Sequence, residues 1–311
     1  MSKHDFPMRG ELDCEFRSEA AYADVVRGWI DGAVAEVYSA EVAEILDGAP
    51  LNPEVIRRGG VPCGPPGSMW GFCSTTVRAS QGRGQRSYSR VISAKNLAWF
   101  REKIAAGPLS ATLAISRLGP GGFPQDRLAR ITVERAEGAE SWVRMSCEFP
   151  EHLLGDEQFE TRFVRFLKSQ AGTANPSFGQ VAYNYTLGET ALETVLGPPW
   201  LLPRETVTES RTFLRGYDWI TVCPEELSSG LDLDALVKDG HFYEAERLSR
   251  GGVWLRAAAR FSGYGPAQVR GMWDALAPLL RPGIPLRFEE EPDRPPVPVI
   301  YEDAASVTPV D

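Results

Sequence analysis

Three consecutive segments in the middle of the chain alternate strictly between apolar and polar residues. Because successive side chains of a β-strand point to opposite faces, this period of two indicates strands that are buried on one side only. Glycine-rich turns separate the segments, at 119–122 and at 137–138. The sequence therefore predicts an antiparallel meander with one face toward water. Its strands are expected at 109–117, 127–134 and 141–149.

Apolar residues elsewhere recur at helical spacing. Ser18 and Ser93 stand just before two of these stretches and are typical N-cap residues. A similar alternation at 11–17 sets Leu12 and Cys14 against Glu11 and Asp13, which predicts a further half-buried strand. We expect an α+β fold in which helices cover antiparallel sheet. The helices are expected at 18–33, 39–46, 93–107, 156–169, 189–196, 232–238 and 266–280.

The order of these elements suggests three parts. We expect an N-terminal α+β half at 1–172, a C-terminal α+β half at 173–288 and a tail at 289–311. In both halves a tryptophan, Trp142 or Trp219, begins a strand that is followed by proline and glutamate, so an internal duplication is a further hypothesis. The tail is acidic and rich in proline, which favours a flexible or extended, solvated segment over a docking one.

Charge and hydropathy restrict the classes of function. The chain has 311 residues and a net charge of -9, which argues against a nucleic-acid binder and permits a basic partner. No run approaches the ~18 apolar residues of a membrane-spanning helix, and the first residues do not form a secretory signal. The five cysteines include no C-x-x-C pair. We therefore expect a cytoplasmic protein with free thiols and no membrane or nucleic-acid partner.

Residue patterns for catalysis are missing. The three histidines are scattered, whereas a zinc site needs three or four convergent ligands. Cys63 lies in a loop without an adjacent base, and Gly119-Pro120-Gly121-Gly122 lacks the lysine of a phosphate-binding loop. The sequence thus predicts a protein that is not an enzyme and that needs no cofactor or metal.

One stretch, from Phe213 to Pro282, combines a distinctive order of motifs. Arg215-Gly216 and Trp219 precede a short strand, a leucine-rich helix and two further strands. The stretch ends in a helix with the sequence ALAPLLRPG. It resembles the C-terminal part of the type VI secretion immunity-protein family, and Gly179–Tyr185 is similar to the strand that precedes it there. The resemblance covers residues 173–311 and is weak over 1–108.

This resemblance implies a cytoplasmic protein that binds a cognate toxin and neutralises it, with no catalytic residues. Such an inhibitor would occlude or distort the active site of the toxin. Exposed aromatic residues are enriched at interface hot spots, and an acidic face would steer a basic toxin toward the inhibitor. We therefore predict partner contacts at six residues of the second half. They are Trp219, Glu225, Glu226, Glu244, Glu246 and Trp254.

The tryptophans also have a competing interpretation. Trp142 and Trp254 alternate away from the apolar faces of their strands, so they are either exposed or covered by a helix on that side. Two alternative functions stay open. One is an enzyme or small-molecule binder with the proline-rich loop 48–69 as a lid. The other is a structural subunit whose tail docks onto a neighbour.

Overall fold

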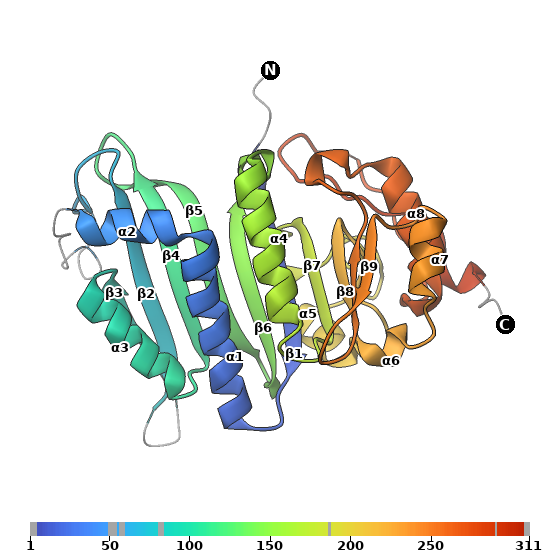
Figure 1. The fold of residues 1–311 in the computed structure, drawn as a ribbon, viewed down its shortest axis with the longest axis horizontal. Helices are drawn as coiled ribbons and strands as arrows, with labels where there is room; N and C mark the ends of the chain where they lie inside the picture. The colour runs from blue at the N-terminus through green and yellow to red at the C-terminus, as the bar shows by residue number, and fades with distance from the viewer. Residues whose placement is uncertain are drawn as a thin grey trace. The chain divides into compact units, whose positions relative to one another are not determined.

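The computed structural model describes residues 5–48, 55, 60–79, 84–185, 188–289 and 291–307. The chain forms two compact units (Figure 1). Unit 1 contains Met1–Glu15, Ala136–Trp142 and Glu151–Asp311, and unit 2 contains Phe16–Arg135 and Val143–Pro150. Both units combine antiparallel strands with helices, which confirms the predicted α+β class.

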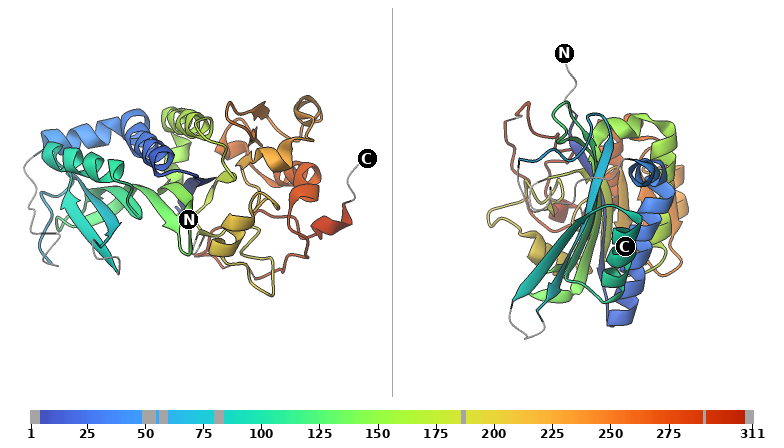
Figure 2. Two further views of the ribbon diagram at one scale, coloured as in Figure 1. Left: turned by 90° about the horizontal axis from the view of Figure 1, so that it is seen from below. Right: turned by 90° about the vertical axis from the view of Figure 1, so that its left-hand side faces the viewer.

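Unit 2 contains the predicted meander. Its strands follow one another in the order β3-β2-β4-β5-β6. They are β2 (Met69–Arg78), β3 (Gln85–Val91), β4 (Ser110–Leu118), β5 (Pro124–Ala136) and β6 (Ala139–Pro150, of which Val143–Pro150 belongs to this unit). Three helices lie on one face of the sheet (Figure 2). They are α1 (Glu19–Gly32), which continues as a π-helical segment at Ala33–Val37, α2 (Ser39–Asp47) and α3 (Ala94–Ala105).

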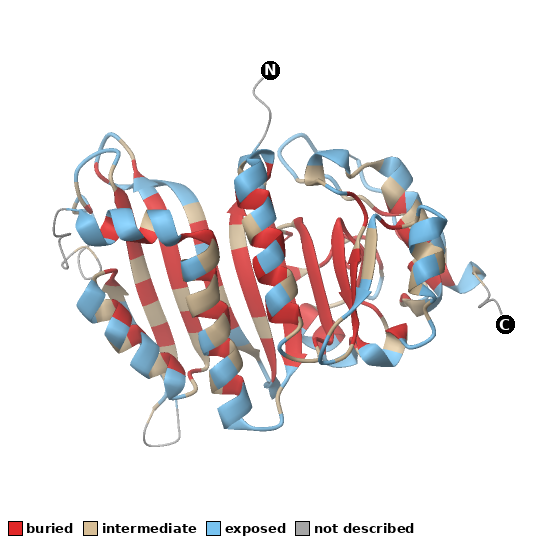
Figure 3. Ribbon diagram, in the orientation of Figure 1, coloured by how far each residue is buried: buried red, intermediate tan, exposed pale blue. Residues whose placement is uncertain are grey.

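The burial of β5 follows its period of two, as Figure 3 shows, whereas in β4 Ala114 and Ser116, on the other face, are buried as well. Leu113 of β4 lies opposite Ile131 of β5, and both side chains are fully buried. Thr112 precedes Leu113 in β4 and Thr132 follows Ile131 in β5. These two threonines form a half-buried pair on the other face. The predicted caps are also present, since the Ser18 hydroxyl accepts a hydrogen bond from the N–H of Ala21 at 3.2 Å.

Unit 1 contains a second group of strands in the order β1-β7-β8-β10-β9. They are β1 (Pro7–Glu15), β7 (Phe178–Tyr183), β8 (Ile220–Cys223), β9 (Glu244–Arg247) and β10 (Val253–Arg256). The helices are α4 (Glu157–Ala171), α5 (Pro203–Glu209), α6 (Glu225–Ser228), α7 (Leu233–Lys238) and α8 (Pro266–Leu276). Short 3-10 turns lie at Glu151–Gly155, Phe261–Gly263, Ala277–Leu279 and Ala304–Ser306. The helix predicted at 189–196 is a series of turns.

The first strand differs from the prediction because both of its faces are covered. A Cβ atom on Gly10 would lie 2.5 Å from the ring of Phe163 in α4, so the backbone of β1 packs closely against that helix. Glu11 and Asp13 project from the opposite face and are also fully buried. The predicted wet face of this strand is therefore wrong. The turns after Gly188 and helix α5 cover it, through contacts described below.

Pairing between strands that are distant in the sequence also determines which residues belong to unit 1. β1 pairs antiparallel with β7, with Met8 opposite Tyr183, so residues on both sides of the predicted boundary at 172/173 belong to one unit. The tail packs as well: Val299 is buried, and the N–H of Ile300 donates a hydrogen bond to the Tyr217 hydroxyl at 2.8 Å. The tail is therefore packed around Val299, whereas residues 291–294 are exposed. The hypothesis of an internal duplication stays a prediction.

Candidate partner-binding surfaces

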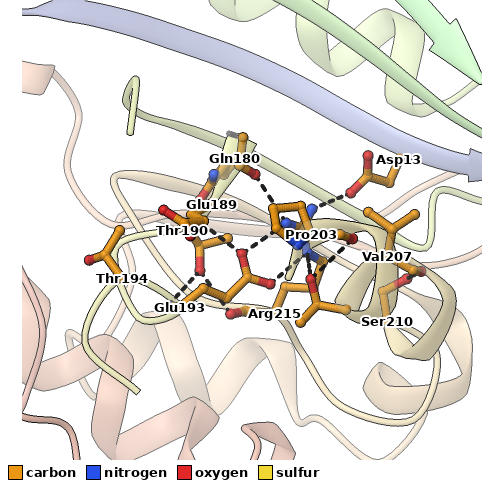
Figure 4. A network of polar contacts seen from close by, with 12 residues as sticks. Asp13, Gln180, Glu189, Thr190, Glu193, Thr194, Pro203, Val207, Ser210 and Arg215 are labelled. Carbon is orange, nitrogen blue, oxygen red and sulfur yellow. Dashed lines mark hydrogen bonds and ion pairs between the residues drawn. The ribbon is translucent and has the colours of Figure 1, made fainter. Parts of the chain in front are cut away.

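A fully buried network of charged side chains lies in unit 1 (Figure 4). The guanidinium of Arg215 donates to Asp13 Oδ2 at 2.5 Å. It also donates to both carboxylate oxygens of Glu193, each at 2.9 Å. Its Nε lies 3.2 Å from the hydroxyl of Thr206 in α5. Arg215 therefore connects β1 with the turns that precede α5 and with α5 itself.

A second arginine extends the network along β1. Arg9 Nε lies 3.0 Å from Glu11 Oε2, and Arg9 Nη1 donates to Asn184 Oδ1 at 3.0 Å. Gln180 of β7 donates from Nε2 to the other oxygen of Glu11 at 2.8 Å. Each charged group thus faces an opposite charge, as burial in a low-dielectric interior requires.

The network is structural, because solvent does not reach it. Burial alone would lower the pKa of Arg215, but Glu193 and Asp13 outweigh this effect and raise that pKa, so the arginine stays charged. Thr190 and Glu193 cap each other reciprocally, with N–H to side-chain distances of 2.8 and 3.2 Å. The spacing Thr-x-x-Glu is a capping-box signal in the sequence, and it could have indicated this turn.

The two tryptophans predicted to contact a partner are buried instead. Trp219 and Trp254 have no exposed surface, so the prediction that they are exposed is wrong. The indole N–H of Trp219 donates to the carbonyl of Ala258 at 3.0 Å. Lys168 of α4 lies over the ring of Trp254, 6.0 Å from its centroid. The competing interpretation, a tryptophan covered by a helix, is therefore confirmed for Trp254.

Glu225 and Glu226, at the start of α6, are exposed as predicted. Both already have partners within unit 1. Arg211 donates from Nη1 to the two carboxylate oxygens of Glu226 at 2.8 and 2.7 Å, and Glu225 accepts from the N–H of Gly252 at 3.0 Å. Their contact with another protein stays a prediction.

Glu244 and Glu246 project from β9 toward the same cation. The ammonium of Lys168 donates to Glu244 at 2.6 Å and to Glu246 at 2.8 Å. Burial raises the pKa of Glu244, but the hydrogen bond and the positive charge of Lys168, together with hydrogen bonds from Trp254 and Glu246, lower that pKa overall. The structure therefore brings these two acids together around one lysine beside Trp254 rather than as a free acidic face.

A patch of exposed apolar side chains was not predicted. Trp200 is 52% exposed and Phe288 58%, and their ring centroids lie 6.1 Å apart. Ile284 and Leu286, at alternate positions of the segment that leads to Phe288, are 66% and 37% exposed. We call these four residues the Trp200 patch. The acidic residues Glu289, Glu291 and Asp293 follow it in the sequence and are exposed.

An open groove of about 1010 Å³ lies elsewhere in unit 1. Aromatic rings line it, and the chain from Pro296 to Ile300 forms another part of its wall. The rings belong to Phe6, Tyr183, Phe261 and Tyr264. The only charged residues among the described lining residues are Asp5, Glu151 and His152.

The ionisable groups of the groove are paired with one another. His152 Nδ1 lies 2.6 Å from Asp5 Oδ2, and the Tyr183 hydroxyl donates to Glu151 at 3.1 Å. Burial raises the pKa of Tyr183, and the negative charge of Glu151 raises it further. The tyrosine is therefore a hydrogen-bond donor, and a proton-abstracting role for it is disfavoured.

Asp218 is a buried acid whose charge influences the tyrosines of this groove. Its Oδ1 accepts the N–H of Trp219 at 2.7 Å, whereas Oδ2 has no hydrogen-bond partner among the described residues. Burial raises the pKa of Asp218 to about 8, although the Trp219 N–H lowers it somewhat. The carboxyl group is thus mainly protonated at neutral pH.

Chemistry at the cysteines is restricted by burial. All five are free and buried, including Cys63 in its loop. Its N–H donates to the carbonyl of Gly122 at 2.7 Å, and burial raises the pKa of its thiol. In the described part of the chain, no group of three or more His, Cys, Asp or Glu side chains could hold a metal ion. The described helices are too short or too polar to span a membrane.

Comparison with known proteins shows that the fold of this chain is similar to that of a solved structure. No protein-family model matches the chain, and no curated protein matches it. Its structure is similar to that of the Pseudomonas aeruginosa T6SS protein PA0821, with a TM-score of 0.51 and 14% sequence identity. The similarity covers 92% of this chain and 78% of that one. The two chains therefore share a fold that occurs in a protein of the type VI secretion system.

Proposed function

We propose that this chain is a non-catalytic binding protein, an immunity-type inhibitor that neutralises a cognate toxin of a type VI secretion system by direct contact. Two independent likenesses support the proposal. The sequence from Phe213 to Pro282 resembles the immunity-protein family, and the fold is similar to that of a T6SS protein. The proposal places the protein in the cytoplasm, where free thiols such as those of its five cysteines persist.

The observation that carries the proposal is the Trp200 patch. Large apolar side chains that gather on a surface mark interaction sites, and tryptophan is the residue most enriched at binding hot spots. Trp200 and Phe288 are both more than half exposed and lie next to each other. The acids that follow, Glu289, Glu291 and Asp293, would attract a basic toxin and accelerate its association.

The experiment is an affinity purification of the tagged full-length protein from its native host. Wild type is compared with Trp200→Ala/Phe288→Ala, and with Val237→Ala as a control for an exposed apolar residue outside the patch. Wild type and control are expected to retain one stoichiometric partner. The double variant is expected to bind it at least ~30-fold more weakly, the effect of losing a hot spot.

Toxicity decides whether the partner is a toxin. The partner expressed alone is expected to arrest growth, and co-expression of this chain to restore it. A partner that is harmless when expressed alone, or retention that the double variant leaves unchanged, would count against the proposal.

The two alternatives are less well supported. Part of the proposed lid, at 49–54 and 56–59, lies outside the described residues, so the small-molecule alternative stays a prediction. A docking tail would need free residues at the C-terminus. Within 291–307, Val299 and Ala304 are buried against unit 1, and Glu302 pairs with Arg270 at 2.6 Å.

A further inference from the structure

We infer that the groove in unit 1 binds an extended segment of the partner protein that carries lysine or arginine between apolar residues. The groove is distinct from the Trp200 patch, because none of its described lining residues belongs to that patch. This inference rests on the proposed function for the identity of the partner. The chemistry of the bound segment is argued from the groove itself.

The size and walls of the groove fit a peptide. Pockets for drug-sized ligands have volumes of ~300–1000 Å³, and this open groove, at about 1010 Å³, lies at the top of that range. Aromatic-lined grooves are a recurring way to bind extended and proline-containing segments. Four rings and the chain from Pro296 to Ile300 supply such walls here.

The charges of the groove select a cation. Its described lining residues include the carboxylates of Asp5 and Glu151 but no lysine or arginine, and the one imidazole, that of His152, lies 2.6 Å from Asp5. The faces of tyrosine and phenylalanine rings attract cations within ~6 Å of their centroids. A segment that carries lysine or arginine can therefore place its apolar side chains on the rings and its charge beside the carboxylates.

The walls are held in place before any ligand binds. Phe261 packs edge-on against Tyr183 and Trp219, with ring centroids 5.9 and 5.5 Å away, and its N–H donates to Glu160 at 3.2 Å. On the other side, the bond from the Ile300 N–H to the Tyr217 hydroxyl fixes the tail segment. Pre-organised walls reduce the entropy that binding must cost.

The first test uses defined peptides and does not depend on a toxin. Acetyl-Pro-Leu-Lys-Pro-Leu-Lys-amide and its counterpart with glutamate in place of lysine are titrated into the full-length protein by calorimetry. The lysine peptide is expected to bind at least ~10-fold more tightly, with an affinity that falls as salt is added. Val297→Arg, in the groove wall, is expected to abolish this binding, whereas Val237→Arg on α7 leaves it unchanged.

A charge variant tests the carboxylates separately. The double variant Asp5→Asn/Glu151→Gln keeps the shape of both side chains and removes their charges. It is expected to lower the affinity for the lysine peptide several-fold. Glu225→Gln/Glu226→Gln is the matched control, since these acids lie outside the groove. Equal binding of the two peptides, no binding of either, or equal effects of the two double variants would overturn the inference.

The partner purified as above provides the second test. If a toxin is captured and neither Val297→Arg nor Asp5→Asn/Glu151→Gln weakens its binding, the groove inference fails and the proposed function stands. If no toxin is captured but the lysine peptide binds as expected, the proposed function fails and the assignment of the groove as a site for cationic peptides stands. Binding of octylammonium as tight as that of the peptide would overturn the peptide assignment in favour of a small organic cation.

Discussion

Arg215 and Asp13, which are 202 positions apart in the sequence, form a fully buried ion pair with 2.5 Å between Nη1 and Oδ2. The pair joins the first strand of unit 1 to the segment that covers it. Glu193 holds the other side of the guanidinium, so one arginine faces two carboxylates. Because buried charges are tolerated only when paired, each partner depends on the others.

Removal of this arginine is expected to destabilise unit 1 strongly. Arg215→Met would leave Asp13 and Glu193 buried opposite an apolar side chain. The free energy of unfolding should fall by about 3–5 kcal/mol, as measured by urea denaturation. The control is Arg204→Met, which removes an exposed pair with Glu205 and should cost less than about 1 kcal/mol. Equal stability of the two variants would contradict the role of the network.

The contact between β1 and α4 leaves no room for a methyl group. A Cβ atom on Gly10 would lie 2.5 Å from the ring of Phe163, which is fully buried and packed against Phe159 and Phe166. Gly10→Ala is therefore expected to lower the free energy of unfolding by about 1–3 kcal/mol. Gly230→Ala is the control because its Cβ would meet nothing within 4 Å. Thermal denaturation of the two variants compares them directly.

The carboxyl group of Asp218 predicts a pH dependence of stability. Its pKa in the folded protein is about 8, against 3.8 for the ordinary group. Below about pH 4 the group is protonated in both states and does not affect folding. Between about pH 4 and 8 only the unfolded chain is ionised, so folding takes up a proton and stability falls as the pH rises. Above about pH 8 the group is ionised in both states, and stability no longer falls through this group as the pH rises.

Asp218→Asn removes this titration and keeps an acceptor for the Trp219 N–H. We compare the free energy of unfolding of the variant with that of wild type at each pH. The variant minus wild-type difference should be larger at pH 8 than at pH 5 by a few kcal/mol. Urea denaturation at both pH values measures the difference. The control is Asp274→Asn, at an exposed carboxylate that pairs with Arg270. Its difference in free energy of unfolding from wild type should be the same at both pH values. A constant difference for Asp218→Asn would show that the acid is ionised throughout.

The thiols are expected to be unreactive in the native protein. Burial raises the pKa of Cys14, Cys73 and Cys147 to about 12, and it also raises the pKa of Cys63 and Cys223. Because the thiolate is the reactive form, DTNB at pH 8 should label none of the five within minutes and all of them in guanidinium chloride. Rapid labelling of one thiol in the native state would identify a site that opens readily.

Local pattern predicted the three helices of unit 2 and the strands of its meander, whereas β3 was not predicted. The alternation in β4 and β5 decides which side chains face the helices, because successive side chains of a strand point to opposite faces of the sheet. The hydroxyls of Ser18 and Ser93 cap α1 and α3 as expected, since capping depends on residues within one turn. These predictions were correct because each one rests on neighbours in the sequence.

The candidate surfaces were harder to predict, since exposure depends on distant residues. Trp254 alternates like an exposed residue, but Lys168 of α4 lies over its ring and the side chain is fully buried. Trp200 follows a proline-rich break and gave no periodic signal, yet it is exposed beside Phe288, 88 positions later by residue number. The groove likewise combines Asp5, near the start of the chain, with Ile300, near its end.

The sequence by itself determined the class of fold, the strands of the meander, the helix caps and the acidic balance of this protein. Each follows from local periodicity, local hydrogen bonding or composition. Only the tertiary structure decided that Glu11 and Asp13 are buried with Arg215, that the tail packs on unit 1 and that a groove forms there. From sequence alone, a strand with charges on one face is predicted to be half-exposed. Here a second layer supplies the opposite charge to that face, and that charge comes from Arg215, 202 positions from Asp13.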